Sequence, residues 1–137
     1  MTKPTRDLNL LLHTLEPVLN TGIYVFCSIP LHTNLGAIKP LATFREAEGL
    51  TVVLEESIAI AANFTVLFRA AWITLTVQSD LQAVGLTAAV ARALSDAGIS
   101  CNVIAAAFHD HIFVPMEDAR TAIAVLVKLQ KEAIFAV

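Results

Sequence analysis

Apolar and polar side chains alternate most regularly between residues 72 and 78. Ile73, Leu75 and Val77 are apolar, and the positions beside them are occupied by Trp72, Thr74, Thr76 and Gln78. Successive side chains of a β-strand point to opposite faces of the sheet, so this alternation predicts a strand with one buried face. We expect helices to cover the face of Ile73, Leu75 and Val77, and Trp72 and the threonines to lie on the opposite face.

Four further elements are predicted after this strand, in the order helix, strand, strand, helix: residues 86–97, 100–106, 112–114 and 116–131. The first helix has apolar residues at helical spacing and is followed by Gly98, which suits a helix C-terminus. The segment 100–106 is apolar, as in a buried strand, and a turn follows at His109-Asp110. This order is most of a split βαβ unit, the ferredoxin-like plan, and residues 133–137 are expected to supply its closing strand.

The first half of the chain predicts a different series of elements. It reads as a short helix capped by Thr5 or Asp7, a strand, a hairpin, one or two helical turns and a long strand: residues 8–15, 23–29, 43–55, 57–62 and 64–78. Gly49, in the hairpin turn, is expected to adopt a positive φ. The last segment exceeds the usual strand length of about five or six residues, so we expect one strand to serve both halves.

Two segments of the sequence resemble the ACT-domain family, which are small amino-acid-sensing modules. They are SDLQAVGLTAAVARALSDAGISCNV, followed by FHDHIFVP, and ATFREAEGLT. The whole chain resembles short bacterial proteins made of two ACT-like halves and, more distantly, the tandem-ACT arginine sensors of animal cells. With the element order, this resemblance predicts an α+β protein of two ferredoxin-like halves, residues 1–68 and 69–137, which share a core. The antiparallel strands would lie side by side, with the helices on one face.

The composition favours an oligomeric cytoplasmic protein. Hydrophobic residues make up 56% of the chain and charged residues 15%, which leaves little polar surface for a monomer. The net charge of −3 argues against a nucleic-acid partner. No apolar stretch reaches the roughly 20 residues that span a bilayer, and the first residues lack the core of a signal peptide. We therefore expect a homo-oligomer in the cytoplasm, with no membrane or nucleic-acid partner.

The candidate ligand site is the bend from Ser79 to Thr87. Free backbone N–H groups at the helix start can bind a carboxylate, Gly85 allows close approach, and Asp80 can accept hydrogen bonds from an ammonium group. In ACT domains this loop commonly forms the effector site, so the resemblance assigns an amino acid or similar metabolite to Ser79, Asp80, Val84, Gly85, Leu86, Asn102 and Val103. Alternatively, Ser79 or Asp80 only caps the helix and Gly85 only permits helix packing.

Arg45 is a further candidate for ligand binding. Its guanidinium group could hold a carboxylate with two parallel hydrogen bonds. Its segment also belongs to the ACT-like resemblance, which favours a ligand cleft between the halves. The alternative is an exposed ion pair across strands, worth less than about 1 kcal/mol.

A third candidate is the sequence His109-Asp110-His111. On a strand the two histidines would point the same way and could ligate zinc, but a zinc site needs three or four ligands. The alternative is a polar hairpin turn. Since nucleophile, phosphate-loop and dinucleotide motifs are absent from the sequence, we expect neither a metal nor a cofactor.

Three functions remain open from the sequence alone. The first is a sensor of an amino acid or similar metabolite, without catalysis. The second is a small metal-dependent enzyme built on His109, Asp110, His111 and Cys101. The third is an interaction subunit that binds no ligand.

Overall fold

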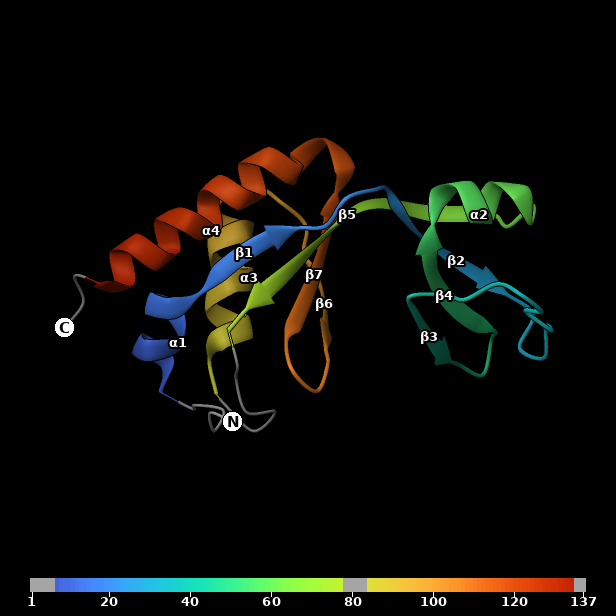
Figure 1. Cartoon of the computed structure of the whole chain (residues 1–137), viewed down its shortest axis with the longest axis horizontal. Coiled ribbons are helices and arrows are strands. Elements are labelled where there is room, and N and C mark those ends of the chain that lie inside the picture. The colour runs from blue at the N-terminus through green and yellow to red at the C-terminus, as the bar shows by residue number, and fades with distance from the viewer. Residues whose placement is uncertain (1–6, 78–83, 135–137) are drawn as a thin grey trace. The chain divides into compact units, whose positions relative to one another are not determined.

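Two compact units make up the protein. The computed structural model describes residues 7–77 and 84–134 (Figure 1). Unit 1 comprises the described parts of residues 1–20 and 72–137, and unit 2 comprises residues 21–71. Strand β5 (Val66–Thr76) begins in unit 2 and ends in unit 1, which confirms the prediction of one long strand that serves both halves.

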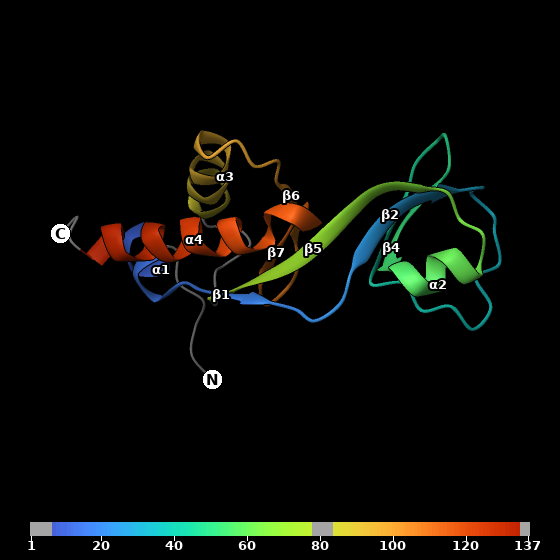
Figure 2. The ribbon, with the colours of Figure 1, turned by 90° about the horizontal axis from the view of Figure 1, so that it is seen from above.

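Unit 2 contains an antiparallel sheet with one short helix. Its strands are β2 (Tyr24–Ile29), β3 (Ala42–Arg45), β4 (Leu50–Glu55) and the first part of β5, in the order β3-β4-β2-β5. Helix α2 (Glu56–Ala61) contacts β2 and β4, as Figure 2 shows. This is the ferredoxin-like strand order, with the loop of residues 30–41 in the place of the first helix.

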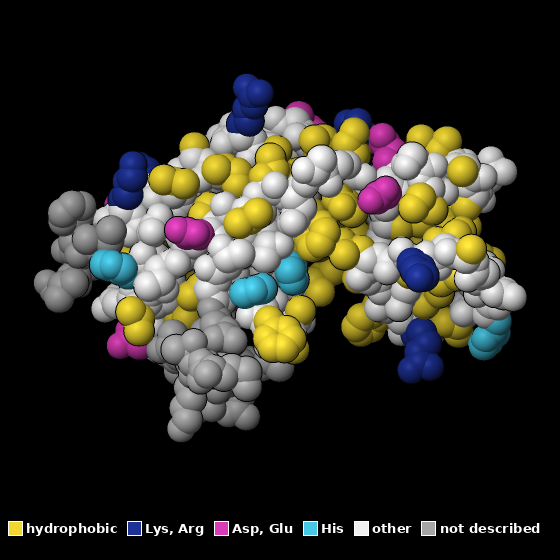
Figure 3. Space-filling model, viewed as in Figure 1, with side chains coloured by type: hydrophobic (Ala, Val, Ile, Leu, Met, Phe, Trp, Pro, Cys, Tyr) yellow, Lys and Arg dark blue, Asp and Glu magenta, His cyan; other side chains and the backbone are white. Residues whose placement is uncertain are grey.

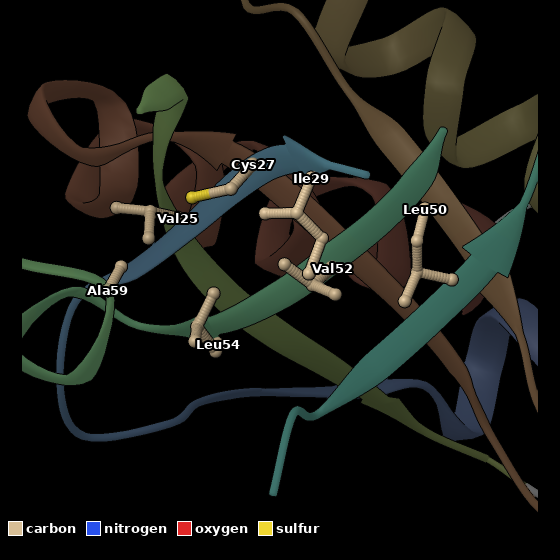
Figure 4. Packing of buried hydrophobic residues seen from close by; sticks show 7 residues of the cluster. All are labelled: Val25, Cys27, Ile29, Leu50, Val52, Leu54 and Ala59. Carbon is tan, nitrogen blue, oxygen red and sulfur yellow. The ribbon is translucent and has the colours of Figure 1, made fainter. Parts of the chain in front are cut away.

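The core of unit 2 forms on the α2 side of this sheet. Alternate residues of β2 lie directly opposite alternate residues of β4, so their side chains share one face. Figure 4 shows the resulting cluster, which consists of Val25, Cys27, Ile29, Leu50, Val52, Leu54 and Ala59. Leu50, Val52 and Leu54 are therefore buried against α2 and the preceding loop, and Val53, which is not part of this cluster, is buried as well.

The hairpin of unit 2 has the predicted position, but the expectation for Gly49 was wrong. Gly49 does not adopt a positive φ. A Cβ added at Gly49 would lie 2.8 Å from the carbonyl oxygen of Ile29 and 3.1 Å from Oγ of Ser28. Glycine is required here because the turn packs closely against the end of β2, and its torsional freedom is not used.

The strands of unit 1 continue the same antiparallel sheet through β5 and are covered by helices. They are β1 (Glu16–Leu19), the end of β5, β7 (Asp110–Pro115) and β6 (Asn102–Ala105), in the order β1-β5-β7-β6. The helices are α1 (Leu8–Thr14), α3 (Leu86–Asp96) and α4 (Ala119–Ile134), the last preceded by the short helix η1 (Met116–Asp118). The expected α+β class with ferredoxin-like halves and antiparallel strands is confirmed.

The strand that closes the sheet of unit 1 comes from an unexpected part of the chain. We predicted it at residues 133–137, but Ala133 and Ile134 belong to α4. Strand β1 takes the place instead, with Glu16 opposite Thr76 and Leu19 opposite Ile73, and lies beside β5 in Figure 1. Proline is tolerated in an edge strand because the outer N–H groups have no partner strand. Pro17 is therefore compatible with a strand at residues 16–19.

Strand β6 is also less buried than predicted. It lies at the edge of the sheet, and Asn102, Val103 and Ala105 are exposed. By contrast, Ile73 and Leu75 of β5 are completely buried, as the alternation predicted. Thr74, on the opposite face, is buried as well, with 8% of its surface exposed.

Several large apolar side chains remain exposed within each unit. The most exposed are Val84 and Phe108 in unit 1 and Phe44 and Leu67 in unit 2. Figure 3 shows hydrophobic side chains interspersed with few charged ones over this face of the molecule. Among the helices of the described residues, none combines the length and the apolar character needed to cross a membrane.

Candidate functional site

The predicted ligand site lies where β5 leads into α3. Of its residues, Ser79 and Asp80 lie outside the described residues. Val84 is 83% exposed, whereas Leu86 is buried as the first residue of α3. Between them, Gly85 is the N-cap of α3 and has a φ of 102°. This left-handed backbone conformation is the physical reason for glycine at position 85.

The N-terminus of α3 has the electrostatic character that an anion requires. The N-cap, Gly85, has no side chain with which to cap the helix, and no acidic residue occupies the first turn. The Gly85 carbonyl already accepts the first intrahelical hydrogen bond, from the N–H of Ala89 at 2.9 Å. The first N–H groups of a helix lack intrahelical partners and carry a partial positive charge, which favours a carboxylate.

Gly85 also has a structural role in the packing of unit 1. A Cβ added at this position would lie 3.1 Å from Cδ2 of Leu8, in α1. In the direction of a side chain at position 85, Gly85 therefore faces Leu8 of the same unit. A side chain at position 85 would be strained by the positive φ and would press on α1, so its effects on folding and on ligand binding would be mixed.

The remaining predicted residues lie on edge strands. Asn102 and Val103 belong to β6 of unit 1, opposite Phe113 and Ile112 of β7. Their exposure leaves them accessible to a ligand. Arg45 belongs to β3 of unit 2, and is also exposed. The bend and β6 therefore belong to one unit, and Arg45 belongs to the other.

His111 takes part in a hydrogen-bonded cluster on the face of the sheet opposite Ile73. The indole Nε1–H of Trp72 donates to Nδ1 of His111 at 3.0 Å, and Oγ1 of Thr74 lies 3.1 Å from the same nitrogen. Asn20 donates from Nδ2 to Oγ1 of Thr74 at 2.9 Å. The Trp72 ring also stacks on Phe113, with centroids 6.5 Å apart and an interplanar angle of 17°.

This geometry determines the protonation state of His111. Since the indole N–H can only donate, Nδ1 of His111 must accept, and the ring is neutral with its proton on Nε2. Burial lowers the pKa of His111, and the nearby His109 lowers it further, whereas the Asp110 carboxylate acts in the opposite direction. With Nδ1 accepting from Trp72 and the proton on Nε2, neither ring nitrogen of His111 has a free lone pair for a metal ion.

The other members of the candidate metal site lie in different surroundings. His109 follows the turn before β7, and its Nδ1 lies 3.5 Å from the Val77 carbonyl oxygen. Asp110 is buried, with 8% of its surface exposed. In residues 7–77 and 84–134, no three His, Cys, Asp or Glu side chains form a group that could hold a metal ion. Burial raises the pKa of the Cys101 thiol and that of the Cys27 thiol, which disfavours the reactive thiolates.

Two features were not predicted from the sequence. The pairing of Trp72 with His111 joins residues that are far apart in the chain, and its only local signal was a tryptophan on the polar face of an alternating strand. The second feature is an open pocket of unit 2 next to Tyr24 and Glu55. Its residues come from three separated segments, so no local pattern indicates it.

Unit 1 also has a shallow groove between α3 and α4, with a volume of about 520 Å³. Its floor consists of small and aliphatic side chains, including Ala93 and Leu129. Its rim carries two ion pairs, Arg92 with Asp96 at 3.9 Å and Lys128 with Glu132 at 3.8 Å. These pairs join neighbouring turns of single helices and are exposed, so each contributes less than about 1 kcal/mol to stability.

Known protein families and structures match both units. Family models described as ACT domain match residues 3–71 and 68–128. A Vibrio cholerae protein of unknown function, named as a possible transport protein, is 47% identical over 90% of this chain and 95% of its own, with a TM-score of 0.82. No protein with a curated description matches the chain.

More distant structures share the fold. An Agrobacterium tumefaciens protein is 18% identical, covers 85% of this chain and 89% of its own, and has a TM-score of 0.68. The ligand-free regulatory subunit of aspartate kinase from Thermus thermophilus is 10% identical over 82% of this chain and 95% of its own, with a TM-score of 0.57. At such low identity these two similarities concern the fold alone.

Proposed function

Because the chain belongs to the ACT-domain family, we propose that it is a regulatory protein without catalytic activity that senses an amino acid by binding it. The observation that carries this proposal is the tandem match, since two ACT domains together account for residues 3–128. ACT domains are modules that bind small molecules and regulate other proteins. The identity of the ligand as an amino acid is the specific part of the proposal.

The proposed site is the bend before α3. The uncapped first turn of α3 supports a role in holding the ligand carboxylate, and the exposure of Val84 leaves this end of the helix accessible. Asp80 would receive the ammonium group. Asn102 and Val103, on the exposed strand β6, would contribute a wall of the site. Arg45 is the alternative partner for a carboxylate, in unit 2.

The experiment that tests the function is a thermal unfolding screen against the twenty amino acids, one at a time. A ligand that binds only the folded state raises the midpoint, and a hundredfold excess over the dissociation constant adds about 2.7 kcal/mol of stability. We expect one amino acid, or a few related ones, to raise the midpoint. If none does so at millimolar concentration, the sensor function is refuted and an interaction subunit without ligand becomes the better explanation.

The position of the site is tested with Val84→Glu. This side chain is exposed, so the fold should tolerate the change, and a negative charge near a helix N-terminus adds about 0.3–1 kcal/mol of stability. The same charge repels a bound carboxylate, so calorimetry should show that binding of the amino acid found by the screen is lost. Val84→Gln is the uncharged control and should bind as the parent does.

Asp80→Ala provides a second test of the same site. Removal of the carboxylate should weaken binding by about 1–3 kcal/mol, the usual cost of leaving a charged group without its partner. If Val84→Glu and Asp80→Ala both bind the amino acid as tightly as the parent, the ligand site lies elsewhere.

We also propose that the protein works as a homodimer in the cytoplasm. The support for self-association is the high hydrophobic content of the chain together with exposed apolar side chains such as Phe44 and Phe108. Light scattering at micromolar concentration should give twice the mass of one chain. A monomeric mass, with and without amino acids, would refute this assembly.

A further inference from the structure

We infer that unit 2 carries a separate pocket for an aliphatic α-amino acid, built on Lys39 and Glu55. The pocket has a volume of about 310 Å³. It is lined by residues from the start of β2, the loop before β3, the end of β4 and helix α2: Tyr24, Lys39, Pro40, Leu41, Glu55 and Ile58. All of these belong to unit 2, so the pocket shares no residue with the bend before α3.

The two charges of the pocket match the two charges of an α-amino acid. Lys39 can bind the carboxylate and Glu55 can bind the ammonium group. Both side chains are exposed, and within the described residues neither forms an ion pair. The pocket is therefore lined by one positive and one negative group that do not form an ion pair with each other.

Glu55 is available for a ligand because the neighbouring cation, Arg69, pairs with Glu56. The carboxylate of Glu56 forms an ion pair with Nε of Arg69 at 2.7 Å. Glu55 is the N-cap residue of α2, yet its side chain does not form a capping hydrogen bond. Glu55 lies directly opposite Tyr24 in the pairing of β2 with β4, and both residues line the pocket. Burial raises the pKa of Tyr24, and the charge of Glu55 raises it further.

The other lining residues form an apolar wall that is held by the fold. The Leu41 N–H donates to the Val53 carbonyl at 2.7 Å, which ties the end of the loop to β4. The hydroxyl of Tyr24 donates to the Thr21 carbonyl at 3.3 Å, so the ring is fixed at its far end. With Ile58 and Pro40, these side chains offer apolar contact to an aliphatic side chain.

The size of the pocket selects a small ligand. Pockets for small molecules and cofactors generally measure about 300–1,000 Å³, and this one lies at the lower end of that range. This volume suits a single amino acid. This inference rests on the proposed function for the class of ligand, an amino acid. Its residues and its unit differ from those of the site proposed at the bend before α3.

The test uses calorimetry with three related compounds. L-leucine carries both charges, L-leucinamide lacks the carboxylate, and N-acetyl-L-leucine lacks the ammonium group. We expect the parent protein to bind L-leucine and to bind each analogue about three- to tenfold more weakly, the range expected for one partly exposed charged contact. If the parent does not bind L-leucine, or binds all three compounds equally, the inference is overturned.

Two variants connect this discrimination to the named residues. Lys39→Met should weaken L-leucine binding to the level of L-leucinamide, and should leave L-leucinamide unaffected. Glu55→Gln should weaken L-leucine binding in the same way and leave N-acetyl-L-leucine unaffected. Glu48→Gln, an exposed substitution in the hairpin turn of the same unit, is the control for a change in net charge and should bind L-leucine as the parent does. Lys39 and Glu55 are both exposed, so the midpoint of thermal unfolding should be the same in all variants.

The outcome at the bend separates this inference from the proposed function. If Val84→Glu abolishes L-leucine binding while Lys39→Met and Glu55→Gln preserve it, the pocket of unit 2 is overturned and the proposed function stands. If Lys39→Met and Glu55→Gln weaken L-leucine binding as expected and Val84→Glu leaves it unchanged, the pocket is confirmed and the bend is not the site of L-leucine.

Discussion

Substitution of Trp72 by phenylalanine should change both the stability of the protein and the acid–base behaviour of His111. Phenylalanine retains an aromatic ring next to Phe113 but lacks the N–H that donates to Nδ1 of His111 at 3.0 Å. A neutral hydrogen bond contributes about 0.5–1.5 kcal/mol, and the smaller ring removes further apolar contact. We expect a total loss of about 2 kcal/mol in the free energy of unfolding at pH 8.

The pH dependence follows from the lowered pKa of His111. The folded state disfavours the proton, whereas the unfolded chain takes it up at the ordinary pKa of about 6.5. Stability from this group is therefore complete above about pH 6.5 and is lost as the pH falls from there through the pKa of the folded state. In Trp72→Phe, Nδ1 no longer faces an obligatory donor, so the pKa of His111 should rise and the loss of stability in acid should become smaller.

Nuclear magnetic resonance titration of the imidazole gives the pKa, and urea unfolding between pH 5 and pH 8 gives the stability. A double-mutant cycle with His111→Ala isolates the hydrogen bond. Tryptophan and phenylalanine both place an aromatic ring at position 72, and only tryptophan carries the N–H that donates to His111. The expected coupling energy between positions 72 and 111 is about 0.5–1.5 kcal/mol. An unchanged pKa of His111 in Trp72→Phe, together with a coupling energy near zero, would refute the hydrogen-bond assignment.

Two further predictions concern the fold. Gly49→Ala should destabilise the protein by about 1–3 kcal/mol in urea unfolding, because its Cβ would meet the Ile29 carbonyl at 2.8 Å, whereas the exposed control Glu48→Ala should change stability by less than about 0.5 kcal/mol. The fragment of residues 69–137 should lack stable helical circular dichroism, because it loses β1 and the completely buried Leu11 and Leu15, each worth about 1.5–3 kcal/mol. A cooperative unfolding transition in this fragment would instead support a boundary between residues 68 and 69.

Local patterns in the sequence were sufficient for the elements whose burial is periodic. Alternation identified β5 because Ile73 and Leu75 point into the core of unit 1 at every second position. Helical spacing identified α3, and Gly98 after it has a φ of 74°, as its C-terminal position requires. The hairpin of β3 and β4 was predicted from a different signal, the glycine-containing turn at residues 47–49, because neither strand has a strictly periodic burial pattern.

The candidate sites differed in how far the sequence could determine them. The bend before α3 was chosen as a candidate because a strand, a glycine and a helix follow one another in the chain, and Gly85 has the positive φ that makes glycine necessary. Asn102 and Val103 were assigned from family resemblance, and their exposure depends on β6 being the outer strand of the sheet. Whether these residues bind a ligand stays a prediction.

Contacts between distant parts of the chain required the tertiary structure. Strand β1 has four residues and a proline, too short a segment for alternation to be recognised, and it forms because β5 offers an unpaired edge at Thr74 and Thr76. The neutral state of His111 depends on Trp72, 39 positions earlier in the chain. Periodicity reports which face of an element is buried, and so the sequence alone determined the strand β5 and the helix α3. Which segments pair, and which polar groups meet, depends on the energy of packing the whole chain, and only the tertiary structure decided it.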